Sequence, residues 1–268
     1  MNWFEEFSEF TWFTIALLAV ALLGGIFAII KRDKAKPIMA IAGIAEIIII
    51  AAAFITGRPF EGVDRGSGLY IVIIAILIIV MALIMIISGR KDKWGARDIA
   101  YAAMCVAMSF ILSCIKLFTM PQGGTITPAS LLPMMVYTAA FGPARGLVVG
   151  CAYGLLQLFQ GAYVIHPMQM LVDYPMAFGA LALGGFANYI KMPERLKLPA
   201  AVVLGYIGRY IMAVLSGVIF FAEYAGDQGA LIYSLVYNIS YLGPDCVVCA
   251  LVALIPGFGR LINMLKKR

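Results

Sequence analysis

Hydrophobic stretches long enough to cross a bilayer follow one another along the chain, with short polar segments between them. Since a transmembrane helix needs about 20 mostly apolar residues, the pattern predicts nine spans, of which the fifth is short and is expected to begin irregularly. The expected fold class is all-α and polytopic. The predicted spans cover residues 11–30, 37–56, 69–88, 98–118, 127–141, 146–164, 168–189, 199–222 and 231–258.

The charged segment at residues 89–97 divides this pattern into two parts. Residues 1–96 are predicted to form an N-terminal membrane extension of three helices, built mainly from Ile, Ala and Leu. Residues 97–268 are predicted to form a six-helix substrate-binding membrane domain, because most of the polar and aromatic residues that interrupt the spans lie there.

Composition and charge placement both indicate a membrane protein. Hydrophobic residues make up 63% of the chain, charged residues 13%, and the mean hydropathy is +0.97, whereas soluble domains are about half apolar and a quarter charged. The net charge of +6 comes from short basic clusters that all fall on one side of the predicted topology. By the positive-inside rule that side is cytoplasmic, which places the N-terminus outside and the C-terminus inside. We expect no nucleic-acid partner.

One loop on the predicted outer side is polar and rich in glycine. Residues 121–125 read Pro-Gln-Gly-Gly-Thr, and the glycines allow the backbone to approach a ligand closely. Gln122, Gly124 and Thr125 are therefore candidate ligand-binding residues.

The start of the seventh span carries a second polar group. His166 precedes the span, and Gln169 and Asp173 are four residues apart, so they share one helix face. Tyr174 follows Asp173. Since polar groups inside a membrane are costly unless they face a cavity or a partner, these residues favour a ligand pocket.

Further aromatic and polar residues are predicted at the same outer level. A carboxylate with several aromatic rings suits a small, flat, cationic organic ligand, through charge, hydrogen bonding and cation–π contacts. The alternative is an ordinary belt of aromatic residues at the membrane interface. The additional candidates are Phe221, Glu223, Tyr233 and Asn238.

Three charged residues lie near the middle of predicted spans. Arg209 and Asp245 have matching depths and are predicted to form a structural ion pair, since an isolated charge there would be costly. Glu46 in the second span has no evident partner.

Several chemistries find no support in the sequence. It contains no G-x-x-x-x-G-K-[ST] phosphate loop, no H-E-x-x-H metal motif, no G-x-S-x-G nucleophile motif and a single histidine. We therefore expect no enzyme activity, no metal site and no cofactor.

Small residues recur at four-residue spacing, which permits close helix contact. The glycines at 142, 146, 150 and 154 are predicted to serve internal packing. Ala103 and Ala107 are predicted to form a surface for a partner.

Four motifs in residues 98–268 resemble the thiamine-specific substrate-binding (S) components of energy-coupling factor transporters. They are Pro121-Gln122-Gly123-Gly124-Thr-Ile-Thr, His166-Pro167-x-Gln169-x-x-x-Asp173-Tyr174, Ser216-Gly217-Val-x-Phe220-Phe221 and Tyr233-Ser234-Leu-x-x-Asn238. The resemblance covers the six-helix part in order and does not extend to residues 1–96.

The resemblance implies a six-helix bundle that captures thiamine from outside, with Asp173 against the cationic ligand. It also implies that Tyr163, Tyr174, Tyr233 and Asn238 bind the ligand. The two alanines would contact a transmembrane coupling protein, and two separate ATPase subunits would supply the energy. One departure is Ala213, where the family usually has histidine, which makes a thiamine precursor or related heterocycle a candidate ligand.

The sequence thus favours a vitamin-binding subunit in the plasma membrane of a prokaryote, without catalysis of its own. The alternative is a self-sufficient secondary transporter of a small cationic heterocycle, driven by protons or sodium through Glu46, Asp173 and Asp245.

Overall fold

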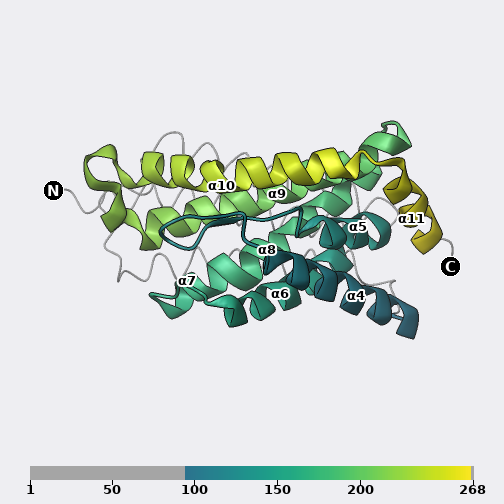
Figure 1. Cartoon of the computed structure of the whole chain (residues 1–268), viewed down its shortest axis with the longest axis horizontal. Coiled ribbons are helices and arrows are strands. Elements are labelled where there is room, and N and C mark those ends of the chain that lie inside the picture. Colours follow the sequence, from purple (N-terminus) through teal and green to yellow (C-terminus); the bar gives the residue numbers. More distant parts are fainter. Residues whose placement is uncertain (1–93, 267–268) are drawn as a thin grey trace, which may run out of the picture. The chain divides into compact units, whose positions relative to one another are not determined.

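The computed structural model describes residues 94–266, so the three N-terminal predicted spans and Glu46 lie outside the described residues. The described residues belong to one compact unit and are mostly helical. The elements in chain order (Figure 1) are α4 (Ala96–Ser113), β1 (Phe118–Thr119), β2 (Thr125–Ile126), α5 (Leu132–Phe141), α6 (Pro143–Gln157), η3 (Leu158–Gln160), α7 (Pro167–Leu171), η4 (Val172–Met176), α8 (Ala177–Gly179), η5 (Ala180–Tyr189), α9 (Glu194–Phe220), η6 (Ala222–Gln228), α10 (Ala230–Ala253) and α11 (Pro256–Lys266).

Each of the six predicted spans after residue 96 coincides with a helical segment, which confirms an all-α, polytopic fold. Four segments among the described residues are long and apolar enough to cross a membrane: α4, Gln169–Tyr189, α9 and α10. Helices suit this setting because they satisfy their own backbone hydrogen bonds where water is absent.

The ends of several spans differ from the prediction. α4 ends at Ser113, and the chain turns into the antiparallel hairpin β1–β2 instead of continuing to residue 118. The fifth span begins irregularly, as predicted, because α5 starts only at Leu132. The prediction of one span through residue 258 is wrong: α10 ends at Ala253, and Pro256, which lacks a backbone N–H, opens the separate helix α11.

The seventh span is irregular in its middle. It runs from α7 through the π-helical turn η4 and the short α8 into the 3-10 helix η5. Pro175 lies inside η4 and cannot donate to the ordinary helical hydrogen-bond ladder. The widened turn carries Asp173 and Tyr174.

Close backbone packing organises the core. A Cβ added at Gly150 or Gly154 of α6 would lie 2.4 Å from the carbonyl oxygen of Phe178 or Tyr174, so only glycine lets α6 approach η4 and α8 this closely. The predicted internal packing is thus confirmed for these two glycines. Gly142 differs: it has open space around it and caps α5 at a φ of 90°. α9 and α10 lie side by side along their length (Figure 1).

Candidate ligand-binding site

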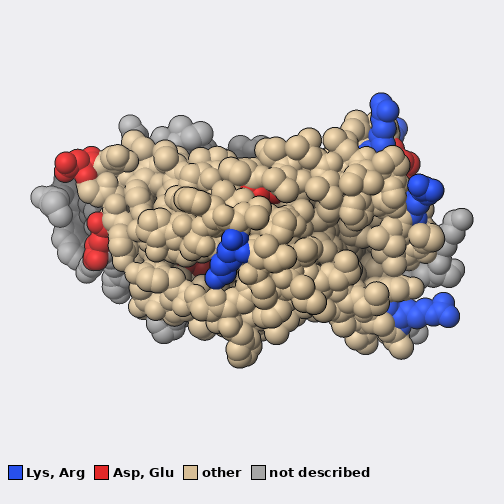
Figure 2. Space-filling view, viewed as in Figure 1, with Lys and Arg blue, Asp and Glu red and all other residues tan. Residues whose placement is uncertain are grey.

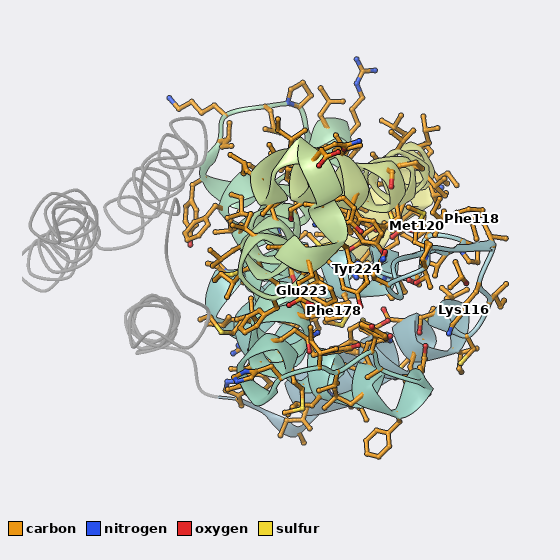
Figure 3. The ribbon with its side chains drawn as sticks, turned by 90° about the vertical axis from the view of Figure 1, so that its left-hand side faces the viewer. Lys116, Phe118, Met120, Phe178, Glu223 and Tyr224 are labelled. Carbon is orange, nitrogen blue, oxygen red and sulfur yellow. The ribbon has the colours of Figure 1, made fainter. Side chains whose placement is uncertain are left out.

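A cavity of about 150 Å³ lies near one end of the bundle, between the hairpin, the end of α6, the η4 turn and the facing parts of α9 and α10. In an end-on view, Phe178, Glu223 and Tyr224 lie near the centre, and Lys116, Phe118 and Met120 lie along one side (Figure 3). The structure brings most of the predicted ligand-binding residues into the lining: Gln122, Gly124, Thr125, Tyr163, Gln169, Asp173, Tyr174, Phe221, Tyr233 and Asn238.

His166 and Glu223 do not line the cavity. The ring of His166 stacks on Phe220, with 5.5 Å between ring centroids, which holds the imidazole away from the lining. Glu223 is exposed in η6, the short helix that follows α9 at the surface. Both residues lie at the same end of the bundle as the cavity but outside its wall.

Asp173 is held in place by Gln169, as their four-residue spacing predicts. The Nε2 of Gln169 donates to Asp173 Oδ2 at 2.5 Å and to the carbonyl oxygen of Tyr163 at 3.1 Å, while its Oε1 accepts from the Ile165 amide at 3.2 Å. Gln169 is buried and Asp173 is half-buried. The carboxylate therefore has a fixed position and faces the cavity with acceptor capacity left over.

Aromatic rings form two pairs in the cavity lining. In the first pair, Tyr163 packs against Phe221 with a centroid distance of 6.0 Å, and its hydroxyl lies 2.8 Å from that of Tyr224. This hydrogen bond raises the pKa of the Tyr224 phenol. In the second pair, Tyr233 stacks on Tyr237 at 5.8 Å. Flat rings in the lining suit a flat heterocycle.

The glycine-rich loop reaches the cavity through a tight contact with α10. A Cβ at Gly124 would lie 2.7 Å from the ring of Tyr241, and the Gly124 amide donates to Tyr237 Oη at 3.3 Å. Gly123 has a φ of 91°. The glycines thus allow close approach, as predicted, and at Gly124 the neighbour is a tyrosine ring of the protein itself.

The predicted ion pair between Arg209 and Asp245 is not formed. Asp245 is buried and accepts hydrogen bonds from the amide and hydroxyl of Thr127, both at 3.0 Å, and from the Tyr206 hydroxyl at 2.6 Å. Arg209 lines the cavity instead, with its guanidinium carbon 4.2 Å from the ring centroid of Phe178. Neutral donors satisfy the acid, so it needs no cationic partner.

Asn238 contributes to the wall mainly by fixing it. Its Nδ2 donates to the carbonyl oxygens of Ala213 and Ser234 at 3.2 and 2.9 Å, and its Oδ1 accepts from the Tyr241 hydroxyl at 3.0 Å. These bonds join α9 to α10 beside the cavity.

Several lining residues were not predicted from the sequence, among them Lys116, Gln157, Gln160 and Tyr241, and Arg209 was predicted in a different role. The Nε2 atoms of Gln157 and Gln160 both donate to Ser113 Oγ, at 3.0 and 2.8 Å. The sequence signal for these two residues was the presence of two amide side chains three residues apart at the outer end of a span, which places them on one helix face. Within the described residues, no group of three or more His, Cys, Asp or Glu side chains could hold a metal ion.

Comparisons with known proteins agree with this architecture. Residues 99–261 match the family described as thiamine transporter protein. The thiamine transporter ThiT of Bacillus subtilis (strain 168) is 32% identical over 176 residues, covering 61% of this chain and 91% of that protein. ThiT of Lacticaseibacillus paracasei is 28% identical over 155 residues, covering 51% of this chain and 73% of that protein. A solved structure of ThiT from Listeria monocytogenes is 25% identical, with a TM-score of 0.50, and the match covers 62% of this chain and 93% of that one.

The chain therefore belongs to the thiamine transporter family, which confirms the resemblance drawn from its motifs. It is a multi-pass membrane protein. Because the family consists of transporters, the expectation that the chain is not an enzyme is also confirmed.

Proposed function

We propose that this family member is a membrane-embedded subunit that captures thiamine, or a close relative, from outside the cell for import driven by separate ATPase subunits. The observation that carries the proposal is the cavity, which combines the Asp173 carboxylate with tyrosine and phenylalanine rings. Thiamine has a cationic thiazolium ring and an aminopyrimidine ring. The carboxylate provides attraction for the cation, and the rings provide stacking and cation–π contacts.

Arg209 and Ala213 are the reason to include close relatives of thiamine. Ala213 lines the cavity where the family resemblance predicts histidine, and Arg209 lies one helical turn away in the same lining. The guanidinium supplies hydrogen-bond donors to ring nitrogens but also a positive charge in the same cavity as Asp173. We therefore propose that the donor set near the pyrimidine differs from that of family members with the histidine.

The charges at the two ends of the described unit support capture from outside. On the face shown in Figure 2, acidic side chains gather at one end and most basic ones at the other. Glu223 and Asp227 follow the end of α9 that lines the ligand cavity, whereas Lys191 and Arg195 lie at its beginning. By the positive-inside rule the cavity end faces outward and the C-terminus lies in the cytoplasm of a prokaryotic cell. The N-terminus, which lies outside the described residues, is expected outside.

The proposed partners are a transmembrane coupling protein and two ATPase subunits of an energy-coupling factor module. The sequence contains no phosphate-binding loop of the G-x-x-x-x-G-K-[ST] type. Ala103 and Ala107 are exposed on α4, next to the exposed Met104 and Met108. A stripe of small and flexible residues allows another helix to approach closely.

The test of ligand capture is calorimetric titration of the full chain in detergent with thiamine, its pyrimidine precursor and its thiazole precursor. Saturable binding of thiamine at one site supports the proposal. Binding of only one precursor would identify that precursor, and not thiamine, as the ligand. If none of the three compounds gave a binding signal, the proposal would be overturned.

The test of coupling is uptake by cells. The double variant Ala103→Leu/Ala107→Leu should abolish uptake. Its affinity for thiamine should stay within about twofold of that of the unsubstituted protein, because neither residue lines the cavity. An ion-driven secondary transporter predicts the opposite dependence: ionophores, rather than loss of the ATPase subunits, would stop uptake.

A further inference from the structure

A second cavity, of about 240 Å³, lies at the other end of α9 and α10 from the ligand cavity. α9 lines the ligand cavity near its last turn with Gly217 and the second cavity in its first turn with Glu194. α10 lines the two cavities with Tyr233 and Ala253, respectively. The C-terminal helix α11 forms one side of the second cavity and packs against α5 and α9.

Basic side chains outnumber acidic ones in the lining of this second cavity. Its lining includes Arg195, Lys197, Arg260 and Lys266, and Glu194 is its one acidic residue. Glu194 is already paired with Lys197, at 2.5 Å between Nζ and Oε1. Among residues 94–266, no acidic side chain lies within ion-pair distance of Arg195, Arg260 or Lys266. The cavity thus carries positive charge that the described part of the protein does not neutralise.

Lys266 shows how closely the positive charges are placed. Its Nζ donates to Asn188 Oδ1 at 3.1 Å, and the side chain lines the cavity. Burial, and then the nearby positive charge of Lys197, hold the pKa of Lys266 below its usual range. A bound anion would relieve this repulsion.

The position of the cavity relative to the spans decides which anion fits. α9 begins at Glu194 and α10 ends at Ala253, so the basic residues lie where two membrane spans meet the polar region. The lining also includes Leu254 and Ile255, which are 48% and 54% exposed. A charged pocket with an exposed apolar rim at this level suits an amphiphile with an anionic head and acyl chains.

The amphipathic character of α11 supports the same occupant. Ile262 is buried, and Phe258 and Leu265 pack against the core on the same helix face, while Leu261 and Met264 are 37% and 64% exposed. Arg260 and Asn263 line the cavity from this helix. Short helices with an apolar face and basic residues lie in the membrane interface, where phospholipid headgroups are found.

We propose that this second cavity binds the phosphate headgroup of an anionic membrane phospholipid such as phosphatidylglycerol, with Arg195 and Arg260 as its principal phosphate contacts. Both arginines are exposed and make no hydrogen bond or ion pair that would be lost by their replacement. The proposal is independent of thiamine binding, because the two cavities share no lining residue.

The experiment is native mass spectrometry of the full chain, purified in detergent and mixed with phosphatidylglycerol or phosphatidylcholine. We expect retention of phosphatidylglycerol and little of phosphatidylcholine. The double variant Arg195→Gln/Arg260→Gln should bind phosphatidylglycerol about 30-fold more weakly, because it removes two basic residues whose attraction to the anionic headgroup is expected to be similar in size.

A matched control variant distinguishes binding in the cavity from nonspecific attraction between the lipid and the protein's net positive charge. Arg97→Gln/Lys191→Gln removes the same charge from exposed residues that do not line the cavity, and it should leave lipid binding within about twofold. Equal losses in the two double variants would overturn the proposal, as would equal retention of the two lipids. Displacement of the lipid by glycerol 3-phosphate at matched concentration would assign the site to a soluble phosphate and would also overturn it. Circular dichroism spectra and gel-filtration profiles that match those of the unsubstituted protein show that each variant is folded.

Discussion

The surroundings of Asp173 and Asp245 show two ways in which a membrane helix accommodates a carboxylate. Asp245 is 2% exposed and accepts three hydrogen bonds from Thr127 and Tyr206. Asp173 is half-buried, receives one side-chain hydrogen bond from Gln169 and faces a cavity. Donors around a buried carboxylate replace the water that it loses. The saturated acid is thus suited to a structural role, and the acid with spare acceptor capacity is suited to a ligand.

The two regions are also connected. Thr127 follows directly after β2, which carries Thr125 of the cavity lining. By binding Thr127, the Asp245 carboxylate fixes the hairpin against α10 and so positions the glycine-rich loop over the cavity. Asp245 therefore acts at a distance from the ligand, and replacements in the two regions should separate stability from affinity.

The largest expected effect is on stability, from Asp245→Ala. This change leaves the buried Thr127 amide without its acceptor, and it leaves the hydroxyls of Thr127 and Tyr206 with only Ser130 Oγ and Cys249 Sγ as partners. The free energy of unfolding should therefore fall by about 3 kcal/mol. Unfolding of the purified protein by SDS titration measures it. Asp173→Ala is the matched comparison and should change the free energy of unfolding by less than about 1 kcal/mol. Similar losses for the two variants would contradict the distinction between the two acids.

The next effect is on affinity, from Asp173→Asn. Replacing the carboxylate with an amide removes the charge that faces a cationic ring, so thiamine should bind about 30-fold more weakly, or roughly 2 kcal/mol. Calorimetric titration measures this change. Glu223→Gln removes an acid at the same end that does not line the cavity and should change the affinity less than about twofold. An unchanged affinity for Asp173→Asn would remove this residue from the proposed site.

A smaller effect on affinity is expected from Gly124→Ala. The added methyl group would lie 2.7 Å from the Tyr241 ring, so the loop or the ring must shift, and thiamine affinity should fall about tenfold, which corresponds to about 1.4 kcal/mol. Gly257→Ala in α11 is the control, because nothing lies within 4 Å of its added methyl group. Equal affinities for the two variants would show that the loop contact does not shape the cavity.

The sequence predicted the helical spans and ten of the residues that line the cavity, because both leave local patterns. Long apolar runs mark the spans, and the spacing of Gln169 and Asp173 places them on one helix face, where the structure joins them by a hydrogen bond. The break at Pro256 was missed because the apolar run continues across it into residue 258. Hydropathy reports burial in lipid and is insensitive to a change in helix direction.

The role of Arg209 could not be predicted for a different reason. Matching depth along two helices suggested a pair with Asp245, but pairing also depends on which way each residue faces around its helix axis. Thr127 and Tyr206 occupy the space around Asp245, and Phe178 lies under Arg209. Such choices among partners from other elements are set by tertiary packing.

The smallest expected effect comes from Tyr206→Phe, which tests whether the Asp245 network can weaken without disturbing the ligand cavity. The Tyr206 hydroxyl donates to Asp245 at 2.6 Å and lies 3.1 Å from Cys249 Sγ. Its removal leaves both hydrogen bonds from Thr127 in place, so the free energy of unfolding should fall by about 1 kcal/mol. Thiamine affinity should stay within about twofold, because Thr127 still fixes the hairpin.

Tyr237→Phe is the matched comparison and should have the opposite effect. Tyr237 lines the cavity, and its hydroxyl accepts a hydrogen bond from the Gly124 amide, so loss of this hydroxyl should lower thiamine affinity more than stability. If Tyr206→Phe lowered affinity as much as Tyr237→Phe, the buried acid would be part of the ligand site, and the two carboxylates would share one role.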